Sequence, residues 1–360
     1  MMKKIIKIGA LKIGGGNPVA VQGMVKTPPS DKKTVSLINA MTRAGCRMAR
    51  IAVPNMREAG FLADVVKKIK IPLVADIHFD WRLAIAASVA GASKIRINPS
   101  NIGSARKVAD VAASCKDKKI PIRVGANSGS VKTLSHGDKP KTKARKLFNA
   151  VSREVATLEK TGFYDIVVSA KAEDVETTIE VNRLLAKLGY PVHIGVTATG
   201  AESDGIVKSS IALGSLLREG IGDTIRVSLL AGPVAEINAA YSILAAVGLH
   251  KKKINFIACP TCGRCGVDLK SILEKISSRF PDALSGASPA SGKTLNVAIM
   301  GCEVNGPGEA RNADIGLAFT GRKAVYFEKG RIIKTLDRKD SINFMTGKIK
   351  KCLTRNNADC

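Results

Sequence analysis

Four of the eight cysteines lie between residues 259 and 302, in a pattern that suits metal binding. Cys259 and Cys262 form a C-x-x-C pair that contains a proline, and Cys265 follows three residues later. Cys302 lies in a separate glycine-rich segment. A C-x-x-C pair on a tight turn directs two thiolates toward one metal. In a reducing compartment this clustering favours a metal or redox centre over disulfides.

Two kinds of metal centre fit these donors. A zinc ion with four thiolates would use Cys265 as its fourth ligand. An iron–sulfur cluster would take three thiolates and a carboxylate such as Glu309, because the glycines and the proline near Glu309 let the chain fold back toward the metal. A displaceable oxygen ligand would leave a position open for a substrate. The residues by themselves leave both centres possible.

A second group of polar residues recurs near the carboxyl ends of predicted strands. It consists of four arginines and a lysine, accompanied by asparagine and serine side chains: Arg50, Arg96, Asn98, Arg123, Asn127, Lys171, Arg226 and Ser228. Guanidinium groups bind phosphate oxygens in a bidentate manner, so their convergence predicts a strong anion site. One isolated arginine would more simply reach solvent, but recurrence at the same strand position favours a shared site.

Acid–base candidates follow the third of these strands. Asp76, His78 and Asp80 alternate along the chain there. A lone histidine after a strand is commonly a hydrogen-bonded structural residue, and its two carboxylate neighbours are what favour a catalytic role. We therefore treat Asp76 and His78 as candidate catalytic residues.

These side chains need a scaffold that delivers them to one place. Eight short runs rich in β-branched residues alternate with amphipathic helical patterns, as parallel strands with crossover helices do. The runs are 19–24, 48–53, 72–77, 94–98, 120–125, 165–170, 191–197 and 224–229. Eight such units in about 230 residues predict an α/β fold, an N-terminal (β/α)8 TIM-type barrel with its active site at the carboxyl ends of the strands. A doubly wound open sheet is the alternative.

The lysines at 251–253 mark a predicted domain junction. Residues 1–250 form the predicted barrel, which binds the anion, and residues 251–360 form a small α+β domain that carries the metal. In the second domain, the spacing of Leu269, Ile272 and Ile276 predicts a helix, and residues 295–300 a strand that delivers Cys302. Residues 315–336 are predicted strands with a turn at Lys329 and Gly330.

Composition narrows the function class. The formal net charge is +27, so an anionic partner is expected. Aromatic residues make up only 4% of the chain, which argues against stacking surfaces for RNA. A basic zinc-binding protein that acts on RNA is the alternative from another class, and a barrel enzyme with a purely structural metal is a third. No segment resembles a signal peptide or a bilayer span, so we expect a cytoplasmic protein with neither a nucleic-acid nor a membrane partner.

The sequence resembles the bacterial 4-hydroxy-3-methylbut-2-enyl diphosphate synthase family over nearly its whole length. The resemblance lies in residues 13–22, 74–80, 95–103 and 222–229, and most specifically in the cysteine motifs at 259–264 and 300–310. It implies a (β/α)8 barrel and a C-terminal domain that holds a 4Fe-4S cluster through Cys259, Cys262, Cys302 and Glu309, with Cys265 as a spare thiol. It also implies the two-electron reductive ring opening of 2-C-methyl-D-erythritol 2,4-cyclodiphosphate in non-mevalonate isoprenoid biosynthesis.

The resemblance carries further implications for assembly and mechanism. It implies a homodimer in which the cluster domain of one subunit closes over the barrel mouth of the other. The barrel arginines and Lys171 would hold the diphosphate, and Glu309 would move aside so that one iron could bind the substrate oxygen as a Lewis acid. Electrons would come from ferredoxin or flavodoxin, acidic proteins for which a basic surface is suited.

One segment departs from the family's pattern. Where the family usually has Thr-Glu-Ala-Gly after the seventh strand, this chain has Thr197, Ala198, Thr199 and Gly200. The glutamate thought to donate a proton near the substrate is therefore absent. Glu202, four residues beyond Ala198, is the candidate replacement.

Restoring the family's glutamate tests this departure. We expect Ala198→Glu to raise the turnover of the cyclodiphosphate or to leave it unchanged, because the added carboxyl group supplies a general acid at the family's position. Steady-state turnover of the purified variant measures the effect. A collapse of activity would mean that this protein has its own acid arrangement.

Overall fold

The computed structural model describes residues 3–97, 102–131, 133–135, 137–197, 199–281, 293–302 and 310–354. The chain divides into two compact units, Met1–Leu249 and His250–Cys360, and each is described by itself. Within the described ranges, no helix combines the length and the apolar character that crossing a membrane requires.

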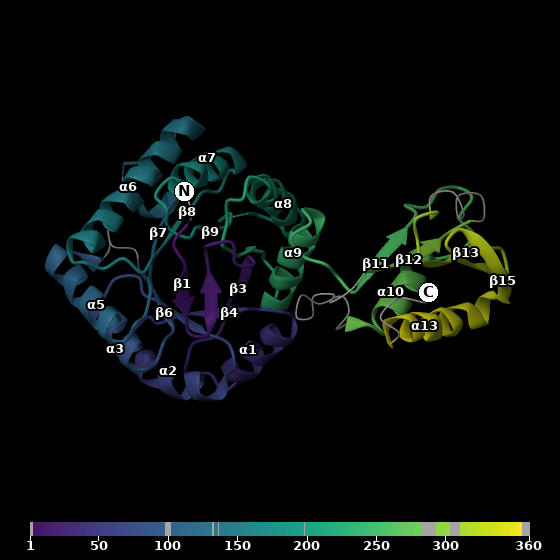
Figure 1. Ribbon diagram of the computed structural model, residues 1–360, viewed down its shortest axis with the longest axis horizontal. Coiled ribbons are helices and arrows are strands. Elements are labelled where there is room, and N and C mark those ends of the chain that lie inside the picture. Colours follow the sequence, from purple (N-terminus) through teal and green to yellow (C-terminus); the bar gives the residue numbers. More distant parts are fainter. Residues whose placement is uncertain are drawn as a thin grey trace. The chain divides into compact units, whose positions relative to one another are not determined.

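The first unit is a (β/α)8 barrel, as the sequence predicts (Figure 1). Its strands are β3 (Ala20–Met24), β4 (Met48–Ala52), β5 (Leu73–Asp76), β6 (Lys94–Ile97), β7 (Ile122–Asn127), β8 (Ile166–Lys171), β9 (His193–Ile194) and β10 (Thr224–Ile225). The neighbouring strands pair in parallel, and β10 pairs with both β3 and β9. A parallel bridge between Val168 and Val192 completes the ring, so the open doubly wound sheet is excluded.

Each predicted run overlaps an observed strand, but the last two strands are shorter than predicted. β9 and β10 contain two residues each. The residues that follow them leave the regular ladder and line the mouth of the barrel, as Thr197, Arg226 and Ser228 do. The predicted runs 191–197 and 224–229 therefore each contain a short strand followed by an irregular segment at the mouth of the barrel.

The helices between the strands surround the barrel (Figure 1). They are α1 (Thr34–Arg43), α2 (Met56–Lys68), α3 (Trp81–Val89), α5 (Ala105–Asp117), α6 (Pro140–Lys160), α7 (Val175–Ala186), α8 (Glu202–Arg218) and α9 (Pro233–Ala246). In α6, the buried residues Leu147, Val151, Val155 and Leu158 are spaced three or four apart, so one face of the helix packs on the barrel.

A small hairpin covers the amino-terminal end of the barrel. Its strands are β1 (Ile6–Ile8) and β2 (Leu11–Ile13). Their isoleucines form a buried apolar cluster with Met48, Val74 and Val167, which lie at or near the starts of their strands. The starts of these strands therefore carry apolar side chains and their ends carry polar ones. This division places any solvent-accessible chemistry at the carboxyl ends.

The second unit is a small α+β domain with a five-stranded sheet. Its elements are β11 (Ile254–Ala258), α10 (Leu269–Ser277), β12 (Leu295–Met300), β13 (Ile315–Thr320), β14 (Lys323–Glu328), β15 (Arg331–Asp337) and α13 (Arg338–Thr354). The first three strands pair in parallel and the last two continue in antiparallel hairpins. Lys329 and Gly330, both with positive φ, form the turn that the sequence predicts.

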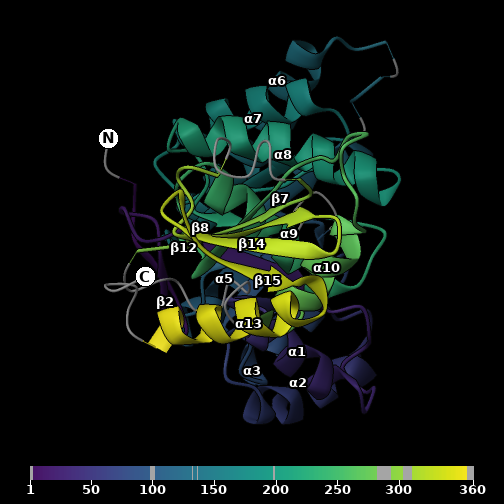
Figure 2. The same cartoon turned by 90° about the vertical axis from the view of Figure 1, so that its right-hand side faces the viewer.

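One face of this sheet packs on the two helices. Ile272 and Ile276 of α10 and Met345 and Ile349 of α13 are buried against apolar residues of β12 and β13. Figure 2 shows α13 running along one side of the sheet. The parallel pairing of β11 and β12 places their carboxyl ends side by side, because Ala258 is in register with Ile299. The cysteine motifs follow these two strand ends.

Candidate active site

Four arginines and a lysine converge at the carboxyl ends of the barrel strands. We call Arg50, Arg96, Arg123, Lys171 and Arg226 the cation layer. They line a hollow of about 460 Å³ together with Asn127, Ser169, Thr197 and Ser228. The structure thus brings together the substrate-binding residues expected from the sequence, except Asn98, which lies outside the described residues.

Strand periodicity positions these side chains. Arg96 and Arg123 are register partners on the neighbouring strands β6 and β7, and Asn127 is the partner of Lys171 on β8. Alternate residues of a strand point to the same face, so residues near the carboxyl ends enter the hollow while their neighbours face the helices. The side chain of Arg123 is 2% exposed, so the layer is buried and not a surface patch.

Asp76 is the carboxylate that links two of the arginines. Its Oδ2 lies 2.6 Å from Nη2 of Arg50, and its Oδ1 lies 3.1 Å from Nη1 of Arg96. Burial opposes ionisation of Asp76, but the charges and hydrogen bonds of Arg50, His78 and Arg96 outweigh burial and hold its pKa well below the ordinary range. Asp76 is therefore ionised near neutral pH, where it accepts hydrogen bonds and cannot donate one.

His78 lies at the outer edge of this group. Its Nε2 is 3.1 Å from Oδ2 of Asp76, and half of its side chain is exposed. Because Asp76 can only accept, Nε2 of His78 donates in this pair. The carboxylate thus fixes the orientation of the imidazole ring, while the exposed part of the ring can exchange protons with solvent. The arrangement suits a positioned proton carrier.

A second carboxylate, Glu236 of α9, was missed by the sequence reasoning. Its Oε2 lies 3.6 Å from Nη2 of Arg226, and its Oε1 accepts a hydrogen bond from the backbone N–H of Leu229 at 3.1 Å. Lys26 approaches the same carboxylate to 3.5 Å. The residue lies inside a helix rather than at a strand end, so strand position could not reveal it. The available signal in the sequence was a single glutamate within the apolar run of α9.

Several donors of the cation layer have no partner among the described residues. They are Nε of Arg50, Arg96, Arg123 and Arg226, Nη1 of Arg123 and Nζ of Lys171. Buried donors without acceptors are unfavourable, so this set calls for a group that is rich in acceptors. Burial, followed by the charges of Arg226 and Arg123, holds the pKa of Lys171 well below the ordinary range. A bound anion would relieve both the repulsion and the missing hydrogen bonds.

Gly195, which follows β9, makes room for Lys171. A Cβ atom at Gly195 would lie 2.6 Å from Nζ of Lys171 and 2.6 Å from the carbonyl oxygen of Arg226. No other residue type fits without displacing one of the two. A glycine inside a predicted strand signals such a close approach, and the sequence reasoning did not use it.

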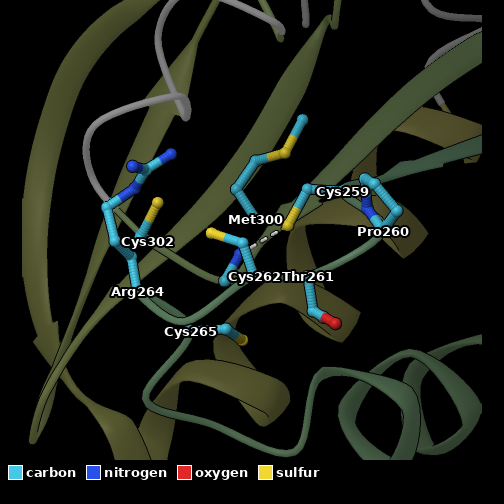
Figure 3. A pocket seen from close by; sticks show the side chains of 9 residues that line it. Cys259, Pro260, Thr261, Cys262, Arg264, Cys265, Met300 and Cys302 are labelled. Carbon is cyan, nitrogen blue, oxygen red and sulfur yellow. Dashed lines mark hydrogen bonds between the residues drawn. The ribbon is translucent and has the colours of Figure 1, made fainter.

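Four cysteines of the second unit line a separate hollow of about 470 Å³ (Figure 3), namely Cys259, Cys262, Cys265 and Cys302. Cys259 and Cys302 follow β11 and β12, whereas Cys262 lies on the turn that contains Thr261 with a φ of 67°. Sγ of Cys259 accepts a hydrogen bond from the backbone N–H of Gly301 at 3.3 Å. An N–H donor of this kind stabilises a thiolate. Glu309, the expected fourth ligand, lies outside the described residues.

Cys265 is oriented differently from the other three. Its Sγ donates to the carbonyl oxygen of Val267 at 3.3 Å. Figure 3 shows the sulfur atoms of Cys259, Cys262 and Cys302 on one side of the loop and that of Cys265 on another. Within the described ranges, no three His, Cys, Asp or Glu side chains converge on a single ion position.

Fold and site together define a two-domain protein with a barrel that contains a buried cluster of basic side chains and with a cysteine-rich α+β domain. Family models match both parts, the GcpE TIM-barrel domain over residues 3–241 and the GcpE protein C-terminal domain over residues 255–351. The chain belongs to the GcpE family.

Curated relatives agree along nearly the full length. A protein of Thermodesulfovibrio yellowstonii named 4-hydroxy-3-methylbut-2-en-1-yl diphosphate synthase (flavodoxin) is 44% identical over 96% of this chain and 97% of its own. Proteins with the same name from Clostridium perfringens and Thermotoga maritima are 47% and 46% identical over 94% and 92% of this chain, and over 95% and 92% of their own chains.

Solved structures of lower identity agree on the barrel. Dihydropteroate synthase from Stenotrophomonas maltophilia superposes with a TM-score of 0.51, covering 68% of this chain and 98% of its own. At 17% identity, this likeness concerns the fold alone.

Asp76→Asn tests the electrostatic role of Asp76. The substitution leaves Arg50 and Arg96 without their shared carboxylate, so we expect the free energy of unfolding at neutral pH to fall by about 3–5 kcal/mol. A carboxylate with a lowered pKa stabilises the fold above its unfolded pKa of about 3.9 and loses this contribution as the pH falls further. The difference in the free energy of unfolding between the unsubstituted protein and Asp76→Asn should therefore shrink below about pH 4. Denaturant unfolding across this range measures it.

Asp80→Asn is the matched control. Asp80 pairs with Arg82 on the surface, and asparagine can still cap α3, so a loss of less than about 1 kcal/mol is expected. Equal losses in the two variants would contradict the role assigned to Asp76.

Proposed function

We propose that this protein is a 4-hydroxy-3-methylbut-2-enyl diphosphate synthase. In the reaction, 2-C-methyl-D-erythritol 2,4-cyclodiphosphate takes up two electrons and two protons and gives the linear allylic diphosphate and water. The relatives that carry this name cover more than nine-tenths of the chain, which supports the reductase interpretation and not the RNA-binding alternative. The observation that carries the proposal at the level of the site is the cation layer, with its unpartnered buried donors.

The cation layer would bind the diphosphate group of the substrate. Arg50, Arg96, Arg123 and Arg226 offer forked N–H donors, and Lys171 offers a single ammonium group. Asn98, Asn127 and Ser228 would add neutral hydrogen bonds that set the orientation. Because the layer is buried, the bound phosphates would be shielded from water, which strengthens each charged contact.

Asp76 and His78 would serve the proton requirement of the reaction. Asp76 is locked between two arginines and acts by positioning His78. His78 would keep the proton on Nε2 in its hydrogen bond to Asp76, and its other ring nitrogen, Nδ1, would carry the proton that goes to the oxygen that leaves as water. Glu202, the candidate replacement for the family's glutamate, lies at the start of α8, and its side chain is exposed to solvent. We assign the proton delivery to His78.

The second domain would hold a 4Fe-4S cluster. Cys259, Cys262 and Cys302 would bind three of its irons and Glu309 the fourth, and the hydrogen bond from Gly301 to Cys259 fits a sulfur that carries negative charge. The cluster, when bound, supplies single electrons and a Lewis-acidic iron. Residues 1–250 would thus provide the diphosphate site and residues 251–360 the redox site.

The partners follow from the same proposal. The names of the relatives specify flavodoxin, and we propose flavodoxin or ferredoxin as the electron donor of this protein. A net charge of +27 favours encounter with an acidic carrier. We also propose a homodimer in which the cluster domain of one subunit closes over the barrel mouth of the other.

Anaerobic purification followed by an assay tests the proposed function. The protein should be brown, contain iron and inorganic sulfide but not zinc, and convert the cyclodiphosphate to the allylic diphosphate when a strong reductant is supplied. A colourless zinc protein would overturn the proposal. A brown protein that binds the substrate without forming product would leave the cluster assignment in place and contradict the assigned reaction.

Serine substitutions of the four cysteines test the ligand set. We expect Cys259→Ser, Cys262→Ser and Cys302→Ser to lose most of the iron and the visible absorbance, because a neutral hydroxyl is a poor replacement for a thiolate. Cys265→Ser is the matched control and should keep both, since Cys265 bonds to Val267. Iron content and absorbance spectra distinguish the variants. Loss of iron in Cys265→Ser would show that the spare thiol is a ligand.

A further inference from the structure

A fully buried lysine lies one layer below the cation layer. Lys94 precedes Arg96 by two residues on β6, so both side chains point into the barrel. Its side chain is 0% exposed. Its Nζ donates to Sδ of Met48 at 3.3 Å, and a thioether is a weak acceptor. Among the described residues, no carboxylate forms an ion pair with Lys94.

The surroundings of Lys94 disfavour a positive charge. The charges of Arg123 of β7 and Arg50 of β4 act on Lys94, and the charge of Lys94 in turn acts on His193 of β9. His193 is itself fully buried, with Nδ1 2.7 Å from Oγ1 of Thr224. Val74 of β5 is the register partner of Lys94 and is apolar, and Asp76 beyond it is engaged by two arginines. Burial first, and then the two arginines, hold the pKa of Lys94 well below the ordinary range.

A diphosphate bound above would change this balance. The layer carries four guanidinium charges that stay protonated near neutral pH, and two carboxylates, Asp76 and Glu236, pair with it. A polyanion in the hollow would offset the excess positive charge that Lys94 faces. An opposite charge favours the protonated form of an amine, and the effect is strong in a medium of low dielectric constant.

We propose that Lys94 is neutral in the empty barrel and takes up a proton when a diphosphate binds, so that it becomes a further positive charge beneath the bound anion. Lys94 is then a positioning residue that acts through the cation layer. The inference rests on the diphosphate site of the proposed function, but it does not depend on the ring-opening reaction. It explains why the barrel keeps a buried amine without a carboxylate partner among the described residues, at a cost in stability.

Calorimetric titration with inorganic pyrophosphate tests the proposal in the full chain. Titrations in buffers of different ionisation enthalpy give the number of protons taken up on binding. We expect the unsubstituted protein to take up about one proton more on binding than the Lys94→Met variant does. This difference should appear at pH values between the pKa of Lys94 in the free protein and its pKa in the bound protein. Affinity of the unsubstituted protein should then weaken more steeply as the pH rises. Lys94→Met should bind about three- to tenfold more weakly near neutral pH.

Two control variants separate the role of Lys94 from other causes. Lys116→Met changes an exposed lysine of α5 and should leave proton uptake and affinity unchanged. Lys171→Met removes a residue that lines the hollow and should weaken binding more than Lys94→Met does. Equal proton uptake by Lys94→Met and the unsubstituted protein would overturn the role of Lys94. Failure of pyrophosphate to bind at all would instead contradict the diphosphate site and the proposed function.

Unfolding of the empty protein gives a second readout. A lysine that is neutral when folded and charged when unfolded makes stability rise with pH, up to its unfolded pKa of about 10.4. Lys94→Met removes the unpaired amine, so the variant should be more stable than the unsubstituted protein below this pH, and its stability should rise less with pH. Lys94→Leu takes its place if the methionine variant does not fold. A less stable leucine variant would show that Lys94 is structural and would overturn the proposal.

Discussion

The main physical constraint on this structure is the repulsion among like charges that are buried together, because the rest of the fold must offset it. Five cationic side chains of the barrel point into one hollow, and desolvation and mutual repulsion both oppose this arrangement. The stability must therefore come from elsewhere in the fold. The isoleucines of the β1–β2 hairpin fill the opposite end of the barrel, and each helix buries an apolar face against the strands. Apolar packing at the other end of the barrel and around its outside thus offsets the cost of the buried charges.

The two carboxylates divide the cation layer into two parts. Asp76 forms ion pairs with Arg50 and Arg96, and Glu236 lies beside Arg226. Within the described ranges, Arg123 and Lys171 form no ion pair, and both have buried donors without partners. The side chains of the layer that form no ion pair in the described part of the chain therefore lie next to each other, on β7 and β8. An incoming anion should be drawn to this side first, while the paired arginines can reorient little because Asp76 holds them.

The sequence was enough to predict the arginines of the site, but it was not enough to predict Glu236, Lys94 or the lengths of β9 and β10. Arg50, Arg96, Arg123 and Arg226 could be assigned to one mouth because the carboxyl ends of parallel strands meet there. Glu236 could not, because its position depends on how α9 packs against the barrel. Lys94 was not recognised because a lysine at a strand start is usually exposed, and only closure of the ring shows that this one points inward. The lengths of β9 and β10 were overestimated because residues that line the site continue the apolar pattern of a strand.

The cysteine site, like the barrel site, forms where the carboxyl ends of neighbouring parallel strands lie side by side. In the second unit, β11 and β12 are parallel neighbours joined through α10, so their carboxyl ends lie side by side. Cys259 and Cys302 follow these ends and therefore meet, although they are far apart in sequence. The pairing of the two strands is enough to bring the two cysteine motifs together, so no specific contact between the motifs is needed. Only Cys262 needs a special backbone, which the positive φ of Thr261 provides. The local strain is thus confined to the turn that must aim a second sulfur atom at the same hollow.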